Sequence, residues 1–454
     1  MIKITRILHA GYIFENQGTK VAFDPVFENP FSVNCYAYPN VKFDVAKIRE
    51  LKFSAVFISH IHDDHCSLES LIYLDRSTPI YIFCAVEEIF LYLKTLGFTQ
   101  VTGLTLDKAV QINSLTIVPR RALDADVDSL FHISAVDLNI LNVVDSWIDP
   151  QTLHKLTLSK PWDLILWPFQ TMREVEVLAP TRFLPADGIL PSEWINQLIS
   201  LQPKFLVPSS CQFIQEEWSW HRQAFFPISY QSFQKQVQSI LPETVIWRLN
   251  PGNSMSLTQN TLCAEESVPW IIPVGDQDLD YQYNPSLKAP TTAEVAKNFP
   301  SLKKDQQAAV IKFCQEDLPK KLSTRELPPE SYFQKSRVWR LSLFDHDGRE
   351  QTFTYRLSNS VVLRLEGYQG NLDWLSEIPV FKLHSALTTG EGLTSLYLRI
   401  NDALFSKETE EALVQADALE DPLIWCLYQG EVASYQRHQL AKILHSRGLV
   451  SATV

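Results

Sequence analysis

The chain has 454 residues, enough for about two or three domains that each bury a core. Hydrophobic residues make up 45% of it and charged residues 20%, as in ordinary globular proteins, and the net charge is −12. This acidic balance argues against non-specific binding to nucleic acid or to an anionic membrane, because both need a basic surface. It does not exclude an anionic substrate, since bound metal ions supply local positive charge.

The cysteines and the N-terminal residues bear on the compartment. The seven cysteines are widely scattered and never form a CxxC pair, which indicates reduced thiols rather than a disulfide framework. The N-terminal residues lack the apolar core of a signal peptide, and no run approaches the ~18 apolar residues of a membrane span. We therefore expect a soluble, cytoplasmic protein without a membrane span.

Strand-like runs alternate with helical patterns through the first half of the chain, which predicts α/β packing with some antiparallel hairpins. The predicted strands are Ile2–Ile7, Tyr12–Phe14, Val21–Phe23, Ala55–Ser59, Ile80–Phe83, Ser114–Val118, Asn139–Val143, Asp163–Trp167, Lys204–Val207 and Val245–Leu249. The clearest predicted helices are Val86–Leu96 and Ser192–Leu201. A turn at Asn250–Asn253 ends this region, so we predict a first domain over residues 1–258.

The remainder of the chain is predicted to form a linker and a smaller domain. Residues 259–330 are rich in proline and polar residues, and they read as a linker whose best helix is Lys304–Glu316. Residues 331–454 predict a C-terminal α+β domain that covers the active-site face, shapes the substrate pocket or mediates assembly as a homo-oligomer. Its predicted strands are Val338–Phe344, Gln351–Leu357 and Val361–Leu365, and its predicted helices are Leu372–Glu377, Lys407–Gln415 and Ser434–Leu444.

The strongest chemical signal is a cluster of histidines and an aspartate directly after a strand. The apolar run Ala55–Ile58 leads into His60-Ile61-His62-Asp63-Asp64-His65. Imidazole nitrogens and carboxylate oxygens suit zinc, iron or manganese, and a loop can aim neighbouring side chains in different directions. His60 and His62 would then hold one metal ion, and Asp64 and His65 a second. A polar loop with chance histidines is the alternative, but three of the chain's 11 histidines fall in these six residues.

This HxHxDH pattern resembles that of the metallo-β-lactamase superfamily. His9-Ala10-Gly11 and Asp24-Pro25 precede it as they do in the lactonase-like branch. Within that branch the chain is most similar to the lactamase-like part of the CMP-N-acetylneuraminate hydroxylases, through segments 124–129, 140–145, 201–213 and 245–252. The resemblance covers residues 1–258, and it implies a metallo-β-lactamase αββα sandwich with a dinuclear metal site.

The resemblance also implies roles for later residues. Asp145 matches the aspartate that bridges the two metal ions, and a carboxylate there has two oxygens to share. The last ligand to the first metal is usually a histidine, but the matching stretch offers only carboxylates, of which Asp126 or Asp128 is expected to ligate. The last ligand to the second metal is missing from the stretch after Val207. His221 or Cys211 is a candidate replacement, and the alternatives are a stacking histidine and a buried thiol.

Two earlier residues are candidates for supporting roles. Asp24 is expected to orient a ligand histidine through its second nitrogen, with a turn-forming Asp-Pro pair as the alternative. His9 is expected to touch substrate or a bound water, unless it is a satisfied strand histidine. Asp64 is expected both to bind a metal ion and to orient the nucleophile, which makes it the candidate catalytic residue.

Three functions follow from such a site, each with a small-molecule substrate. With zinc or manganese, the protein would be a hydrolase of esters, lactones, amides or phosphodiesters. With iron, a carboxylate in place of histidine favours a di-iron oxygenase, although the cysteine–histidine pairs of a Rieske centre are absent from the sequence. The third possibility is a non-catalytic binding protein. We expect two divalent metal ions, which are zinc or else iron or manganese.

Overall fold

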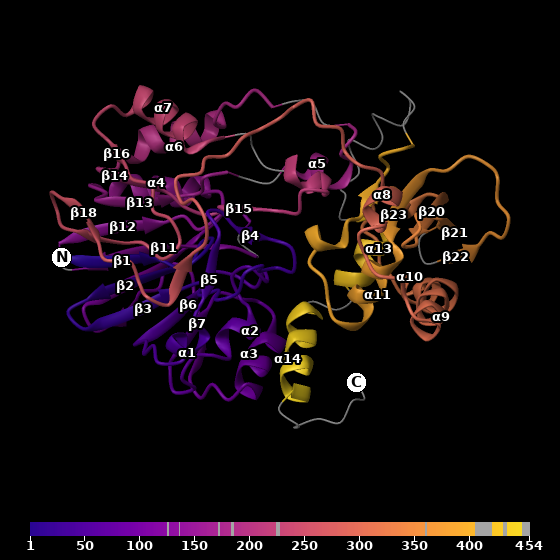
Figure 1. Cartoon of the computed structure of the whole chain (residues 1–454), viewed down its shortest axis with the longest axis horizontal. Helices are drawn as coiled ribbons and strands as arrows, with labels where there is room; N and C mark the ends of the chain where they lie inside the picture. Colours follow the sequence, from indigo (N-terminus) through magenta and orange to yellow (C-terminus); the bar gives the residue numbers. More distant parts are fainter. Residues whose placement is uncertain are drawn as a thin grey trace.

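Two large sheets form the first half of the chain in the computed structural model (Figure 1). The structure describes the chain except for residues 125–126, 136, 171–172, 183–185, 224–227, 359–360, 405–419, 430–433 and 447–454. The first sheet has eight strands in the order β18-β17-β1-β2-β3-β6-β7-β8. Its strands are β1 (Ile2–Arg6), β2 (Tyr12–Asn16), β3 (Thr19–Phe23), β6 (Ala55–Ile58), β7 (Ile80–Ile82), β8 (Val101–Gly103), β17 (Ser254–Leu257) and β18 (Leu262–Glu265).

The second sheet has seven strands in the order β16-β14-β13-β12-β11-β10-β9. They are β9 (Val110–Ile112), β10 (Leu115–Arg121), β11 (Ser129–Ala135), β12 (Leu138–Asn142), β13 (Leu164–Trp167), β14 (Phe205–Pro208) and β16 (Val245–Ile246). Strands β12, β13, β14 and β16 run parallel, and β13 and β14 are buried along their whole length. This pattern is typical of parallel strands that are covered on both faces.

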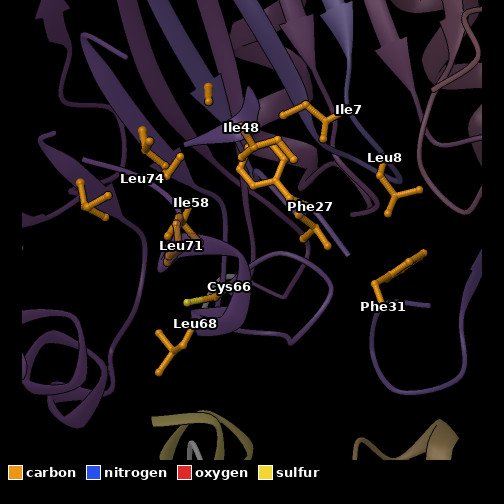
Figure 2. Close-up of a cluster of buried hydrophobic side chains, with 14 of the residues drawn as sticks. Ile7, Leu8, Phe27, Phe31, Ile48, Ile58, Cys66, Leu68, Leu71 and Leu74 are labelled. Atoms are coloured by element: carbon orange, nitrogen blue, oxygen red, sulfur yellow. The ribbon is translucent and has the colours of Figure 1, made fainter. Parts of the chain in front are cut away.

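Three apolar clusters separate four layers. One cluster lies between the two sheets and includes Phe23, Phe57, Phe131 and Leu166. A second lies between the first sheet and α1 (Val45–Ile48), α2 (Leu68–Leu71) and α3 (Glu87–Thr95), and Figure 2 shows part of it. The third packs α4 (Pro150–Leu158), α6 (Ser192–Leu201) and α7 (Tyr230–Ile240) on the second sheet. The layers are therefore helix, sheet, sheet, helix, and the predicted α/β fold class, the metallo-β-lactamase αββα sandwich, is confirmed.

Residues 259–330 connect the sandwich to the C-terminal region and also pack on the sandwich. Strand β19 (Ile271–Pro273) pairs with β5 (Val41–Phe43), and Asp280 accepts hydrogen bonds from the backbone N–H groups of Tyr230 and Gln231 at the start of α7. A further small pair joins β4 (Tyr36–Ala37) to β15 (Phe213–Ile214). The helices are α8 (Thr292–Ala296), α9 (Lys304–Lys312), a π-helical turn (Phe313–Asp317) and α10 (Leu318–Ser323). The domain limits at 258 and 330 stay predictions.

The C-terminal region has its own sheet and apolar cluster, and it lies beside the sandwich (Figure 1). The strand order is β22-β21-β20-β23-β24. Its elements are β20 (Arg337–Phe344), β21 (Glu350–Ser358), β22 (Val361–Arg364), β23 (Trp374–Pro379), α11 (Val380–Thr388), β24 (Arg399–Ile400), α13 (Pro422–Ile424) and α14 (Ser434–Ser446). The cluster also takes in Val177 and Leu178 of α5 (Glu174–Leu178), a helix that reaches across from the sandwich. No helix among the described residues is long and apolar enough to cross a membrane.

Most predicted elements are present, but one predicted helix is wrong, and strands β8, β9, β11, β17 and β18 of the two large sheets are additional to the prediction. The helix predicted at Leu372–Glu377 is wrong, because this segment forms β23, which pairs in parallel with β20 and buries Trp374 and Ile378. Strand β11 was not predicted, although Phe131, Ile133 and Ala135 alternate with less buried residues along it. The predicted helix at Lys407–Gln415 lies outside the described residues.

Candidate metal centre

The candidate ligands lie where strands begin or end at one edge of the sandwich. The loop of residues 59–66, here called the metal loop, follows β6 directly. His9 follows β1, and Asp24 follows β3, which runs parallel to β6. Asp145 follows β12, and Asp128 immediately precedes β11, which is antiparallel to β12. Antiparallel neighbours bring the start of one strand beside the end of the other, so both sheets direct polar side chains to the same edge.

A first group of possible ligands contains His60, His62 and Asp128. His60 Nε2 lies 2.9 Å from His62 Nδ1 and 3.8 Å from Asp128 Oδ1. His60 is buried and His62 is exposed, so the group opens to solvent on one side. Two imidazoles and one carboxylate converge here, as in mononuclear iron or zinc sites that keep positions open.

A second group contains His9, Asp64, His65 and Asp145. His65 Nε2 lies 3.0 Å from Asp145 Oδ2 and 3.7 Å from Asp64 Oδ1. His9 Nε2 lies 3.1 Å from Asp64 Oδ2 and 3.2 Å from His65 Nε2. The structure thus brings His9 into direct contact with the residues that were expected to hold the second metal ion.

The two groups are neighbours. The His60 and His65 ring centroids are 3.9 Å apart, and the negative charge of Asp145 acts on the Asp128 carboxyl. Ser129 Oγ, at the start of β11, donates a hydrogen bond of 2.8 Å to the carbonyl of Ser59 and so joins the two sheets at this point. The arrangement places one continuous polar site across the edge of the sandwich.

The negative charge of the site's carboxylates raises the pKa of neighbouring groups. Burial and the charge of Asp145 raise the pKa of Asp128 to about 6. Burial opposes protonation of His65, but Asp145 and Asp64 outweigh it and raise the pKa of His65 well above its usual value. Burial and the neighbouring His65 lower the pKa of His60 well below its usual value. A cation is therefore favoured among these groups.

Two orphaned oxygen atoms also fit a metal site. Asp128 Oδ1 and Asp145 Oδ1 are buried and have no hydrogen-bond partner among the residues that the structure describes. A buried carboxylate oxygen without a partner is costly, and coordination to a cation relieves that cost. Because Asp145 Oδ2 already faces His65, its free Oδ1 is available to a second ion. The donor set of nitrogen and oxygen atoms suits zinc, iron or manganese.

Asp24 and Ser59 orient the buried histidines. Asp24 Oδ2 lies 3.0 Å from His65 Nδ1, and the Asp24 carboxylate also accepts hydrogen bonds of 2.7 Å from the Ser59 N–H and from the Ser59 hydroxyl. Ser59 Oγ in turn lies 2.9 Å from His60 Nδ1. One fully buried carboxylate therefore fixes the outer nitrogens of two histidines, which leaves their Nε2 atoms facing the site. Ser59 was not singled out from the sequence, where its only signal is its place before His60.

His9 is held by two unusual backbone turns. His9 and Cys211 both have positive φ angles, +50° and +60°, a backbone conformation that residues other than glycine rarely adopt. The left-handed Cys211 directs its N–H to His9 Nδ1 at 3.0 Å. Gly11 allows this turn to sit against Asp24, because a Cβ there would lie 2.7 Å from the Asp24 carbonyl oxygen. The Cys211 thiol itself is in neither ligand group.

The remaining sequence candidates lie elsewhere. Asp126 is outside the described residues. His221 is in neither ligand group. It is buried in a 3₁₀ turn (Trp220–Gln223), where its ring stacks on Tyr397 with a centroid separation of 4.7 Å and an interplanar angle of 7°. Neither ring nitrogen has a hydrogen-bond partner among the described residues. The structure thus brings together His9, Asp24, the metal-loop residues, Asp128 and Asp145, but places His221 at the contact with the C-terminal region.

The burial of His221 predicts loss of stability in acid. Burial, with the charges of Arg399 and Lys382, lowers its pKa to about 3, whereas an unfolded histidine titrates near 6.5. Below pH 6.5 the unfolded state takes up a proton that the folded state does not. The free energy of unfolding therefore decreases as the pH is lowered, by ~2 kcal/mol from pH 8 to pH 5. In urea unfolding without metal, His221→Phe should lose this part of the pH dependence. His346→Phe, at an exposed histidine, should retain it; equal pH dependence in His221→Phe and the wild type would contradict the prediction.

The four layers are those of the metallo-β-lactamase fold, and the histidine–aspartate groups at the strand ends form a candidate metal centre. No protein-family model matches the sequence, and no curated protein matches it. Among solved structures, the chain is similar to the metallo hydrolase Igni18 from Ignicoccus hospitalis, with 17% identity over 57% of this chain and 99% of that one and a TM-score of 0.39.

Two further solved structures are similar over a comparable part of the chain. A possible metal-dependent hydrolase from Veillonella parvula is 14% identical over 57% of this chain and all of that one, with a TM-score of 0.42. CmlA, a diiron β-hydroxylase from Streptomyces venezuelae, is 15% identical over 56% of this chain and 54% of that one, with a TM-score of 0.40. Likenesses this distant carry no functional argument.

Proposed function

We propose that the protein is a metal-dependent hydrolase with two divalent ions at the edge of the sandwich. His60, His62 and Asp128 would hold one ion, Asp64 and His65 the other, and Asp145 would be shared. The observation that carries the proposal is the position of Asp145, with one oxygen 3.0 Å from His65 Nε2 and the other buried without a partner among the described residues. Zinc and manganese are the ions that favour hydrolysis.

When bound, a pair of divalent ions supplies a water of lowered pKa and polarises the carbonyl or phosphoryl group under attack. The protein's own residues fix where this chemistry takes place. His62 is the exposed group of the site, Asp64, Asp128 and Asp145 are partly buried, and His60, His65 and Asp24 are buried, so substrate would approach from the side of His62. Asp64 faces both His9 and His65, which suits it to orient a nucleophile as well as to ligate.

His9 is proposed as a hydrogen-bond donor in this site. Its Nδ1 accepts the Cys211 N–H, so the neutral ring carries its proton on Nε2. A nitrogen that carries a proton has no free lone pair for a metal ion. His9 Nε2 instead points at Asp64 and, at 3.6 Å, at Asp145, where it can donate to a carboxylate or to charge that develops on the substrate.

The test is turnover that depends on added metal. The purified chain, stripped with a chelator and reloaded with Zn²⁺ or Mn²⁺, should hydrolyse at least one member of a panel of p-nitrophenyl esters, lactones, amides and phosphodiesters. The chelator should abolish this activity, and the same metal should restore it. Absence of turnover on every class, with both metals bound, would contradict the proposal.

One observation favours a second candidate, a di-iron oxygenase. In the group of His60, His62 and Asp128 a carboxylate stands where the resemblance leads us to expect a third histidine, and a donor set richer in oxygen suits iron. The sequence lacks the cysteine–histidine pairs of a Rieske centre, so electrons would come from another protein. Oxygen consumption by the Fe²⁺-loaded chain with a chemical reductant, and no hydrolysis with Zn²⁺ or Mn²⁺, would establish this function instead. A small-molecule substrate and a cytoplasmic location are part of either proposal.

A further inference from the structure

The last described helix of the chain lies against the metal loop. Helix α14 packs on α2 and α3 of the sandwich (Figure 1), although these helices lie more than 300 residues earlier in the chain. Its Leu440 and Ile443 join the apolar cluster that includes Cys66 and Leu68, two residues that Figure 2 shows at the end of the metal loop and the start of α2. The C-terminal region thus shares a core with the segment that follows the ligands.

Two buried glutamines of α14 contact the chain within the metal loop and just after it. Gln436 Nε2 donates a hydrogen bond of 2.6 Å to the carbonyl of Ile61, which stands between His60 and His62. Gln439 Oε1 accepts a hydrogen bond of 2.9 Å from the N–H of Leu68, and Gln439 Nε2 lies 3.4 Å from Ser67 Oγ. The two side chains are only 3% and 4% exposed, so water does not replace these bonds.

Both backbone groups belong to a part of the chain with little support of its own. Helix α2 has four residues, and the first N–H groups of a helix have no partner within it. Ser67 caps α2 through the Ser70 N–H, and Gln439 satisfies the N–H of Leu68. The Ile61 carbonyl lies in a loop, outside the strand ladder, where Gln436 satisfies it. Buried backbone groups need such partners, so the two glutamines favour one conformation of the loop.

We propose that Gln436 and Gln439 are positioning residues that hold the metal loop in its ligand-binding conformation. The C-terminal region then sets the affinity for metal without contributing a ligand, since both ligand groups among the described residues come from the sandwich. The link to metal affinity rests on the proposed function, whereas the effect on the loop does not.

The experiment compares variants of the full chain. Gln436→Leu and Gln439→Leu remove the hydrogen bonds, and Gln439→Glu keeps the oxygen that Leu68 needs. Lys442→Ala is the control, because Lys442 pairs with Glu69 at 2.6 Å on the same contact but is 75% exposed and does not touch the loop. Zn²⁺ affinity is measured by competition with a chelator, and amide hydrogen exchange of residues 59–68 is measured without metal.

Both leucine variants should bind Zn²⁺ about 10-fold more weakly at unchanged stoichiometry, as when other partners behind metal ligands are removed. The rate of amide hydrogen exchange in residues 59–68 should also rise about 10-fold, whereas the exchange rates of the two sheets should not change. Lys442→Ala and Gln439→Glu should stay within about twofold of the wild type. If a leucine variant does not fold, Gln436→Glu removes the donor with little change in shape.

Unchanged affinity and unchanged loop exchange in the leucine variants would overturn the proposal, and so would faster exchange spread evenly over the whole chain. If the wild type binds no Zn²⁺, Mn²⁺ or Fe²⁺, the proposed function fails, and loop exchange alone still decides whether the glutamines position the loop.

Discussion

If the protein holds the two metal ions proposed above, Asp145→Asn is expected to lower turnover by about 10³-fold or more and to remove at least one of them. The carboxylate lies 3.0 Å from His65 Nε2 through one oxygen, and its other oxygen is buried without a partner among the described residues, which suits the proposed sharing between two ions. A neutral amide keeps the shape but loses the charge that two cations need. Metal ions contribute several kcal/mol to such reactions, and each ~1.4 kcal/mol is a factor of ten in rate.

The matched control for this change is Asp137→Asn. Asp137 is an exposed residue just before the first residue of β12, whereas Asp145 follows the other end of the same strand. The control should leave metal content and turnover unchanged. If Asp145→Asn retains two tightly bound ions and wild-type turnover, Asp145 is not shared between metal ions.

His9→Phe is expected to lower turnover by about 10²- to 10³-fold while both metal ions stay bound. Loss of one preorganised hydrogen-bond donor in an active site has an effect of about this size. A phenyl ring fits the position, because the His9 ring already lies 5.6 Å from the rings of Phe31 and Phe213. His9→Gln keeps an N–H donor on a side chain of similar reach and should recover part of the activity.

Metal content separates the two roles open to His9. As a donor, fixed by the Cys211 N–H, it can be removed without loss of an ion. If His9 is instead a ligand in place of the missing late histidine, its removal should release an ion. Measurement of bound zinc or manganese in His9→Phe therefore decides between them, and a fall from two ions to one would show that His9 is a ligand.

The candidate ligands and the αββα fold could be predicted because their signals are local. The metal loop is a short run after a buried strand, and the strands carry clear apolar patterns. For the last ligand of the first group, the sequence leaves two candidates, Asp126 and Asp128. Asp128, directly before β11, lies with its Oδ1 3.8 Å from His60 Nε2, whereas Asp126 is outside the described residues.

Features that depend on distant pairing could not be predicted. The contact between His9 and Cys211 joins residues 202 positions apart, and the contact between Gln439 and Leu68 joins residues 371 positions apart. Strand β23 was mistaken for a helix because its pairing with β20, more than local propensity, determines its conformation. The position of His221 could not be predicted either, because its stacking on Tyr397 depends on how the C-terminal region packs.

The metal content of the purified full chain tests the central claim most directly. After reloading and removal of free metal, we expect about two ions of zinc, manganese or iron per chain. A double variant, His60→Ala with His65→Ala, removes one buried nitrogen ligand from each group and should bind essentially none while remaining folded by circular dichroism. A folded wild-type chain that takes up none of these metals, or a double variant that still binds two ions, would contradict the account.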